Sequence, residues 1–431
     1  MSASPRTSGL ERWLAALVFG VPLYYLVTEH TRELFFVTWS KPWTLGVLLY
    51  SAFLCALLWS YTRVWPRWLE VLRRIALVLT GSTFAALVAL EVGLRIADRP
   101  KYQELDNSGR HAADPDVGHV YVPNHRQTLQ SREYRVEWAS NAQGVRCDRD
   151  FGPKQPGVIR VLCVGDSFTA CDQVEYRESW PAVLEACLNH DLQPARFEVV
   201  NAGFPGFATV NEARWIAKFA AAFAPDVVLL GMTPNDLLEN QFPLQYTARN
   251  GQMVSSASTD ADAQRYEHRK NWWCLAGVVE RSLLKARFDK APAVRRLLGR
   301  PPINHMEAYM VERNEKAQRL YALCEQYLED ARANAESLGA KFGLVVIPYS
   351  HQMHALGPNL DPTRFGRHWT EYAAAHGVMA VDALSAFLAH EEPASLHWKE
   401  DTHCTAAGYA LVAAEVCRML VEHREELGLP R

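Results

Sequence analysis

The segment VIRVLCVGDSFTACD passes directly from apolar residues into Gly165-Asp166-Ser167. Residues 158–164 are rich in β-branched side chains and predict a buried strand, after which Ser167 is either a nucleophile or the first residue of a turn. A serine nucleophile needs a base, a group that orients this base, and hydrogen-bond donors for a developing oxyanion. Asp166 is expected to brace the turn rather than to react.

His403 is the histidine that could act as the base. It follows two carboxylates in the segment EDTHCTAAGY, residues 400–409, just before a predicted terminal helix. A serine hydroxyl is a poor nucleophile until a base takes its proton, and Asp401 would hold the imidazole tautomer and stabilise the imidazolium. A histidine at the start of a helix can also have a purely structural role. Whether His403 is a catalytic base depends on whether the fold brings it close to Ser167.

Apolar strands alternate with helical patterns in the C-terminal three quarters of the chain. The strands are expected at 158–164, 197–200, 227–230, 342–347 and 378–381, and the helices at 180–189, 209–223, 306–338 and 406–423. This alternation predicts an α/β domain with a parallel sheet covered on both faces. Ligands bind beyond the carboxyl ends of such strands, where the chain carries Gly165-Asp166-Ser167, then NAGFPGF at 201–207, then GMTPND at 231–236.

These three segments and the terminal Asp-Thr-His segment resemble, in identity and in order, the four signatures of the SGNH subgroup of GDSL hydrolases. The resemblance extends from about residue 141 to the C-terminus. It implies a three-layer flavodoxin-like domain in which Ser167 attacks an ester carbonyl. It also implies an oxyanion hole formed by Gly206 N–H, the Asn235 side chain and Ser167 N–H, and no metal or organic cofactor.

Two features depart from the usual pattern. The common terminal motif places an aspartate three residues before the histidine, where this chain has Glu400, whereas Asp401 lies two before His403. The Asp-Thr-His form resembles proteins of polysaccharide and peptidoglycan O-acetylation, so Asp401 is favoured as the acid and Glu400 is held in reserve. The third motif is also longer than usual, so Asn235 is assigned from the Asp236 that follows it.

The resemblance implies a serine esterase that works through an acyl-enzyme and acts on O-acyl groups, acetyl above all, of envelope or extracellular carbohydrate. An O-acetyltransferase would use the same triad with a sugar hydroxyl as acceptor, and it would need a membrane partner that delivers acetyl groups. An inactive carbohydrate-binding or scaffold protein is a third alternative. The net charge of −3 and the lack of a basic block argue against a nucleic-acid binder.

Residues 1–98 read as a membrane anchor. The stretches 13–28, 42–62 and 75–90 contain no charged residue. Tryptophans lie near the ends of the first two, as in the aromatic belts at membrane interfaces. The segment between the second and third stretches holds Arg63, Arg67, Arg73 and Arg74, which predicts that it faces the cytoplasm. Three transmembrane helices would then place residues 99–431 outside the cytoplasm.

Within residues 99–431, a β-rich lead-in is expected at 99–155, because alternating segments are broken there by Pro, Asn and Gly. Residues 241–304 form an insertion with helical spacing in its second half, which could serve as a lid, lie on the membrane or pack against the sheet. The cysteines show no CxxC spacing, which argues against a metal site and leaves disulfide pairing open.

Overall fold

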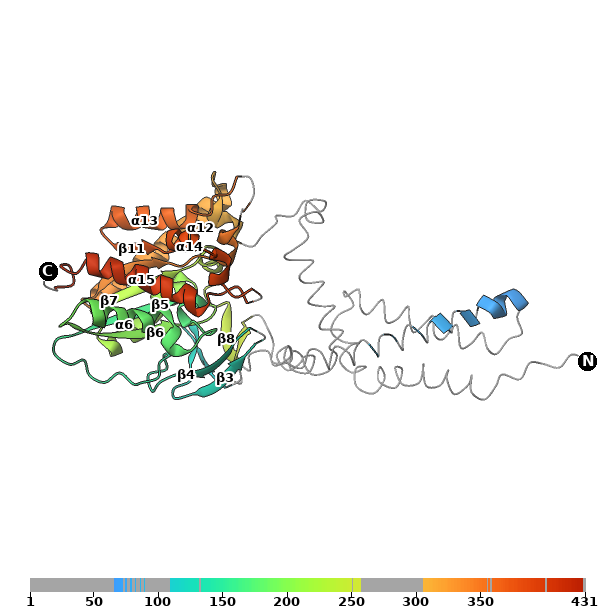
Figure 1. Ribbon diagram of the computed structural model, residues 1–431, viewed down its shortest axis with the longest axis horizontal. Helices are drawn as coiled ribbons and strands as arrows, with labels where there is room; N and C mark the ends of the chain where they lie inside the picture. Colours follow the sequence, from blue (N-terminus) through green and yellow to red (C-terminus); the bar gives the residue numbers. More distant parts are fainter. Residues whose placement is uncertain are drawn as a thin grey trace, which may run out of the picture. The chain divides into compact units, whose positions relative to one another are not determined.

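The computed structural model of the protein describes residues 109–131, 133–249, 251–256, 305–354, 356, 359–399 and 401–428, together with scattered residues between 66 and 89. The chain divides into two compact units, one formed by Met1–Ala97 with Trp273–Ala276 and the other by Asp98–Trp272 with Gly277–Arg431. The strands and helices named below all belong to the second unit, which is drawn from cyan to red in Figure 1.

In the first unit, the described residues between 67 and 89 are helical. Large apolar side chains among them are exposed, including Trp68, Val78 and Leu79. Within the described part of the chain, no helix combines the length and the apolar character that a membrane crossing requires. The predicted spans 13–28 and 42–62 lie outside the described residues, and so does most of 75–90.

Five parallel strands form the central sheet of the second unit. They are β5 (Val158–Gly165), β6 (Arg196–Gly203), β7 (Val227–Met232), β10 (Lys341–Val346) and β11 (Met379–Asp382). Their order is β11-β10-β7-β5-β6, so the sheet is the parallel α/β sheet that the sequence predicts. This is the flavodoxin-like order. The second strand is added on one side of β5 and the later strands on the other, so the strand order reverses between β5 and β7, and such sheets bind ligands at that point.

Helices cover both faces of this sheet (Figure 1). Alternate residues of β5 enter two different cores: Leu162 and Val164 pack with α7 (Thr209–Phe219), α12 (Glu315–Ser337) and α13 (Arg364–His376). Val161 and Cys163 pack with α6 (Trp180–Asp191), α14 (Leu384–Ala389) and α15 (Ala406–Glu422). Burial on both faces explains why the strands read as nearly continuous apolar runs.

The helix predicted at 306–338 is divided in two. A short 3-10 helix at Met306–Tyr309 precedes α12, which begins after Asn314 because the Asn314 side chain accepts a hydrogen bond from Ala317 N–H at 2.8 Å. The helices α13 and α14, in contrast, have no counterpart among the predicted elements.

The segment before the sheet forms two antiparallel hairpins. The first joins β1 (His111–Asp114) to β2 (Gly118–Tyr121), and the second joins β3 (Arg126–Gln130) to β4 (Arg135–Ala139). Tyr121 and Trp138 bury their rings in the same core as α7 and α12. The Tyr121 ring stacks on Phe204, with centroids 4.8 Å apart, so this lead-in packs on the loop that follows β6.

The predicted insertion at 241–304 starts with a hairpin of β8 (Tyr246–Arg249) and β9 (Gln252–Ser255). This hairpin lies against the lead-in. The Tyr246 carbonyl oxygen is so close to Gly118 of β2 that a Cβ on Gly118 would lie 2.3 Å from it. Residues 257–304, for which helical structure is expected, lie outside the described residues.

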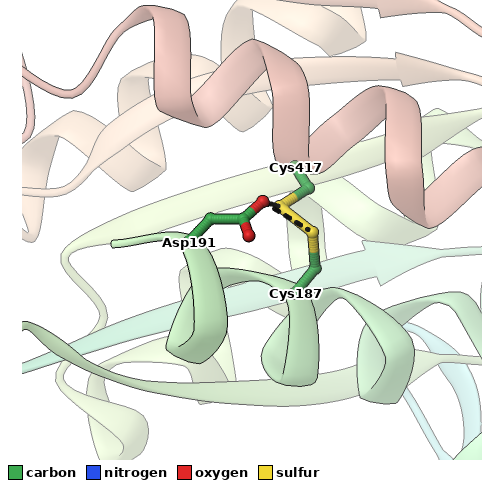
Figure 2. A group of neighbouring side chains, drawn as sticks. All are labelled: Cys187, Asp191 and Cys417. Atoms are coloured by element: carbon green, nitrogen blue, oxygen red, sulfur yellow. Dashed lines mark hydrogen bonds between the residues drawn. A yellow bond between two sulfur atoms is a disulfide. The ribbon is translucent and has the colours of Figure 1, made fainter. Parts of the chain in front are cut away.

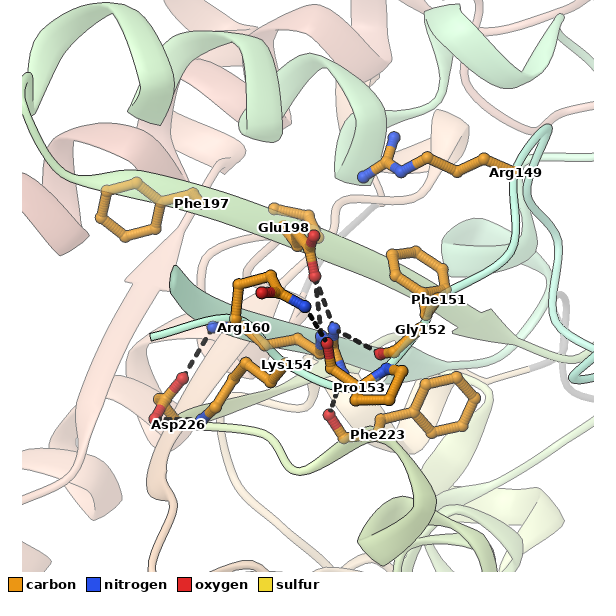
Figure 3. A network of polar contacts seen from close by, with 12 residues as sticks. Arg149, Phe151, Gly152, Pro153, Lys154, Arg160, Phe197, Glu198, Phe223 and Asp226 are labelled. Carbon is orange, nitrogen blue, oxygen red and sulfur yellow. Dashed lines mark hydrogen bonds and ion pairs between the residues drawn. The ribbon is translucent and has the colours of Figure 1, made fainter. Parts of the chain in front are cut away.

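A network of ion pairs joins the amino end of the sheet to the lead-in (Figure 3). Arg160 of β5 is buried, and its guanidinium donates to Glu198 Oε2 at 2.6 Å, to Phe223 O at 2.7 Å and to Gly152 O at 3.1 Å. Asp226 accepts from Arg160 N–H and from Lys154 Nζ, both at 2.7 Å. The buried guanidinium is therefore well partnered, as a charge removed from water must be.

A disulfide between Cys187 and Cys417 joins α6 to α15 across 230 residues of sequence (Figure 2). Asp191 Oδ2 lies 3.5 Å from Cys187 Sγ, and these three residues are close enough to hold a metal ion. Because the two sulfurs are bonded to each other, neither offers a thiolate to a metal. The other cysteines in the described part of the chain are buried and unpaired.

We predict that the Cys187→Ser/Cys417→Ser double variant loses about 2–5 kcal/mol of the free energy of unfolding, because the bond restricts the unfolded chain. Urea denaturation monitored by tryptophan fluorescence measures this loss. Dithiothreitol should destabilise the wild type and leave the double variant unchanged; equal behaviour of the two proteins would contradict the assignment.

Candidate active site

Ser167 begins a short helix, α5 (Ser167–Ala170), directly after β5. Asp166 caps this helix: its side chain accepts a hydrogen bond from Phe168 N–H at 2.8 Å and another from the Thr233 hydroxyl at 2.8 Å. Within the run 161–174 every residue is buried except Ser167, which is partly exposed. Asp166 thus fixes the turn from beneath, and the Ser167 side chain is the one that reaches the surface there.

Glycines at two strand ends make room for Thr169 of α5. A Cβ on Gly165 would lie 2.1 Å from Thr169 Oγ1, and one on Gly231 would lie 2.4 Å from the same atom. Real side chains do not approach this closely, so both positions need glycine while Thr169 is present. The helix α5, which begins with Ser167, is therefore seated tightly on the carboxyl ends of β5 and β7.

His403 connects Ser167 to Asp401 through two hydrogen bonds. Its Nε2 lies 2.8 Å from Ser167 Oγ, and its Nδ1 lies 2.6 Å from Asp401 Oδ1. A carboxylate can only accept, so Nδ1 carries the ring proton and Nε2 accepts from the serine hydroxyl. This arrangement allows the imidazole to take the hydroxyl proton as the oxygen attacks an electrophile.

The residue between Asp401 and His403 has an unusual backbone conformation. Thr402 has φ +73°, in the left-handed region that β-branched residues rarely adopt. This kink accompanies the pairing of Asp401 and His403, which are only two residues apart. Glu400, the reserve candidate for the acid, lies outside the described residues.

A tyrosine of the lead-in holds the other oxygen of Asp401. Tyr134, between β3 and β4, donates its hydroxyl to Asp401 Oδ2 at 2.8 Å, and Asp401 N–H donates to Glu133 Oε2 at 2.8 Å. This contact could not be predicted from the sequence, since an aromatic residue in a hairpin usually packs in a core. Two loops far apart in sequence therefore fix the carboxylate together.

The charges around His403 raise the pKa of its ring. Burial alone would lower that pKa, but the hydrogen bond and charge of Asp401, with smaller contributions from Asp166 and Asp172, outweigh burial. For Asp401, burial opposes ionisation, and the hydrogen bonds from His403 and Tyr134 outweigh it and lower the pKa of the carboxyl group. The pair therefore favours a charged aspartate and a histidine that is a stronger base than in water.

Gly206 lies in a tight turn next to this triad. Phe207 N–H bonds to Phe204 O at 3.2 Å across Pro205-Gly206, and Gly206 has φ +76°. Proline followed by a glycine with positive φ defines a type II turn. Phe204 N–H in turn donates to Gly165 O at 2.9 Å, which places the turn beside the end of β5.

Asn235, the other predicted oxyanion donor, is already engaged by one of its neighbours. Its Nδ2 donates to Glu239 Oε2 at 2.9 Å, and its Oδ1 contacts the oxygen of the Thr233 hydroxyl, whose single proton is directed to Asp166. Burial raises the pKa of Glu239 to about 7. A side-chain amide has two N–H groups, so the bond to Glu239 orients Asn235 and leaves it a second donor.

A family model of the GDSL-like lipase/acylhydrolase family matches residues 163–411, more than half of the chain. The chain belongs to this family and is an enzyme that hydrolyses ester bonds. The match begins within β5, after the lead-in that supplies Tyr134.

Solved structures similar to this chain carry related descriptions. An acetylxylan esterase from Geobacillus stearothermophilus is 15% identical over 61% of this chain and 94% of its own, with a TM-score of 0.36. A lipase/acylhydrolase from Enterococcus faecalis is 14% identical over 62% and 96%, with a TM-score of 0.34. A putative lipolytic protein of the G-D-S-L family from Desulfitobacterium hafniense is 15% identical over 61% and 99%, with a TM-score of 0.35. No curated protein matches the chain.

If His403 acts as the base, kcat/KM should rise with pH as its ring loses a proton, with the midpoint above 6.5 because the pKa of His403 is raised. Asp401→Asn removes the charge that raises this pKa. It should move the midpoint to lower pH while the plateau falls about 1,000- to 10,000-fold. Profiles of kcat/KM from about pH 5 to pH 9 test both shifts. Glu400→Gln is the control, and an equal loss in that variant would instead favour Glu400.

Gly206→Ala should lower kcat at least about tenfold, because the donor N–H belongs to a residue that can no longer keep its conformation. The new Cβ would lie 2.7 Å from Tyr246 Cδ2. Gly157→Ala is the matched control: Gly157 has φ +77° and no atom within 4 Å of its Cβ position. Both variants should lose about 1–2 kcal/mol of stability, but a similar loss of kcat in the two would remove Gly206 from the site.

Proposed function

We propose that this protein is a serine esterase that hydrolyses O-acyl esters, acetyl foremost, on cell-envelope or extracellular carbohydrate. The observation that carries the proposal is the hydrogen-bonded series Ser167–His403–Asp401 at the carboxyl end of β5. The family supplies ester hydrolysis; the roles of these residues and the substrate are part of the proposal.

The reaction would proceed in two steps. In the first, Ser167 Oγ attacks the ester carbonyl, His403 takes the hydroxyl proton, and the imidazolium then protonates the departing sugar oxygen as the ester C–O bond breaks. In the second, His403 takes a proton from water, the resulting hydroxide adds to the acyl-serine, and the acid leaves as Ser167 regains its proton. Asp401 keeps its charge throughout and stabilises the imidazolium.

The oxyanion of each tetrahedral intermediate would receive hydrogen bonds from Gly206 N–H, Asn235 Nδ2 and Ser167 N–H. Ser167 is the first residue of α5, so its N–H has no acceptor within that helix. Loss of one such donor typically costs about 100- to 1,000-fold in kcat. The ring of Tyr246 borders this turn, because a Cβ on Gly206 would lie 2.7 Å from Tyr246 Cδ2.

The proposed location is a multi-pass cell-membrane protein whose catalytic domain lies outside the cytoplasm. The uncharged stretches near the N-terminus and the arginines at 63–74 support this topology. The disulfide between Cys187 and Cys417 is a second, independent support, because such bonds persist in oxidising compartments.

An O-acetyltransferase is the second candidate, favoured by the Asp-Thr-His form of the terminal motif. It would form the same acyl-serine, and a sugar hydroxyl would replace water as the acceptor. Such an enzyme would depend on a membrane partner that supplies acetyl groups.

The purified full-length protein should release acetate from p-nitrophenyl acetate faster than it releases longer acids from the corresponding esters. Ser167→Ala should lower kcat by at least about 1,000-fold, because no acyl-enzyme can form. Ser337→Ala, at an exposed helix end, is the control and should keep wild-type rates. Mass spectrometry with an acetylated oligosaccharide donor and an unacetylated acceptor then distinguishes free acetate from transfer to sugar. Turnover that survives in Ser167→Ala would refute the proposal.

A further inference from the structure

The β1–β2 hairpin and the residue before it carry three buried polar side chains that the proposed reaction does not use. Arg110, His111 and His119 are exposed by only 2%, 2% and 1%. A buried charge and two buried imidazoles are costly unless each is hydrogen-bonded. Their partners lead to the turn that contains Gly206.

The three side chains form a continuous series of hydrogen bonds. Arg110 Nε donates to His111 Nε2 at 3.0 Å, the Nδ1 atoms of His111 and His119 are 3.2 Å apart, and His119 Nε2 lies 3.0 Å from Pro205 O. The guanidinium of Arg110 can only donate and the carbonyl of Pro205 can only accept. Each ring between them must therefore accept on one nitrogen and donate from the other. His119 carries its proton on Nε2, and His111 carries its proton on Nδ1.

This assignment requires both imidazoles to be neutral. Burial, followed by the charge of Arg110, lowers the pKa of His111 well below its usual value. Burial likewise lowers the pKa of His119 to about 4, although its bond to Pro205 opposes that shift. Near neutral pH both rings are therefore uncharged, with one donor and one acceptor each.

Pro205 O and Gly206 N–H belong to the same peptide unit. In a trans peptide these two groups point in opposite directions, so the N–H points away from His119. Type I and type II turns differ by a half-rotation of this central peptide, which would exchange the two directions. A donor placed on Pro205 O therefore favours one of the two orientations.

We propose that His119 is a positioning residue that holds the Pro205–Gly206 peptide with its N–H directed at the oxyanion, and that Arg110 and His111 fix the tautomer this requires. The proposal rests on the proposed esterase function and adds to it the origin of the oxyanion hole's geometry. A series of hydrogen bonds that begins at a cation also polarises its members, which strengthens the final bond to the carbonyl.

At its other end, the series of hydrogen bonds contacts the segment that follows α5. Arg110 Nη2 pairs with Asp172 Oδ2 at 2.8 Å, and Trp138 Nε1 donates to Asp172 Oδ1 at 2.8 Å. Asp172 lies just after α5, so Arg110 and His119 together link the segment after this helix to the turn of Gly206. This common support sets the oxyanion donor relative to the attacking oxygen.

The test compares His119→Phe, which removes the donor, with His119→Gln, which can still donate to Pro205 O from an amide. With p-nitrophenyl acetate and the full-length protein, His119→Phe should lower kcat about 10- to 100-fold, with KM within about twofold, and His119→Gln should recover most of this loss. A trifluoromethyl ketone, which forms a tetrahedral adduct on serine, should lose affinity in parallel with kcat. The acid limb of the pH profile, set by His403, should not move.

His125→Phe is the matched control, because His125 is in the same lead-in but bonds to Gln127 Oε1 at 3.0 Å. The proposal is overturned if folded His119→Phe keeps wild-type kcat, if it loses kcat without losing ketone affinity, or if His119→Gln is as impaired as His119→Phe. Failure of the esterase function is a different result, in which the wild type itself neither turns over esters nor reacts with a fluorophosphonate.

A measurement on the wild type covers the case in which His119→Phe does not fold. Histidine side-chain nitrogen NMR near pH 6, with His119→Gln used for assignment, should show a neutral His119 protonated on Nε2 and a neutral His111 protonated on Nδ1. A cationic ring or the reverse tautomer at either position would refute the proposal.

Discussion

The ion pair between Arg110 and Asp172 joins the two parts of the chain from which the active site is built. Both side chains are almost fully buried, exposed by 2% and 5%. Removal of either would leave an uncompensated charge in a dry interior, which typically costs about 3–5 kcal/mol. The lead-in therefore cannot separate from the sheet without breaking this pair, and the contacts of Tyr134 and His119 with the site depend on it.

The family match begins at residue 163, yet the side chains that support the site from outside lie before that residue. Tyr134 bonds to Asp401, and His119 bonds to the peptide of Gly206. Arg146, also buried, donates to the carbonyl of Ala170 at the end of α5. The loops at the carboxyl end of the sheet carry Ser167, Asp401 and His403, whereas the lead-in contacts and orients their surroundings, so the two form one structural unit around Ser167.

Sequence reasoning located the strands and the residues at their ends because a buried parallel strand is an unbroken apolar run and because its carboxyl end has a fixed place in the fold. It could not find Tyr134, His119 or Asp172, whose contacts bridge segments that are far apart in sequence and show no periodicity. It also missed the orienting contact of Glu239 with Asn235, although the two are one helical turn apart. The left-handed conformation of Thr402, between Asp401 and His403, was likewise not foreseen, because a β-branched residue rarely adopts it.

The packing of Thr169 against Gly165 and Gly231 restricts how this part of the protein can evolve. A side chain at either glycine would occupy the space of the threonine hydroxyl. At Gly231 the one close atom is the threonine hydroxyl oxygen, so an alanine at position 169 would open that position. A Cβ on Gly165 would also lie 2.8 Å from Thr169 Cβ, which alanine keeps, so Gly165 stays restricted. Among descendants of this sequence, changes at positions 169 and 231 should occur together while Gly165 persists, so this pattern would trace the seat of α5 even where the rest of the chain has diverged.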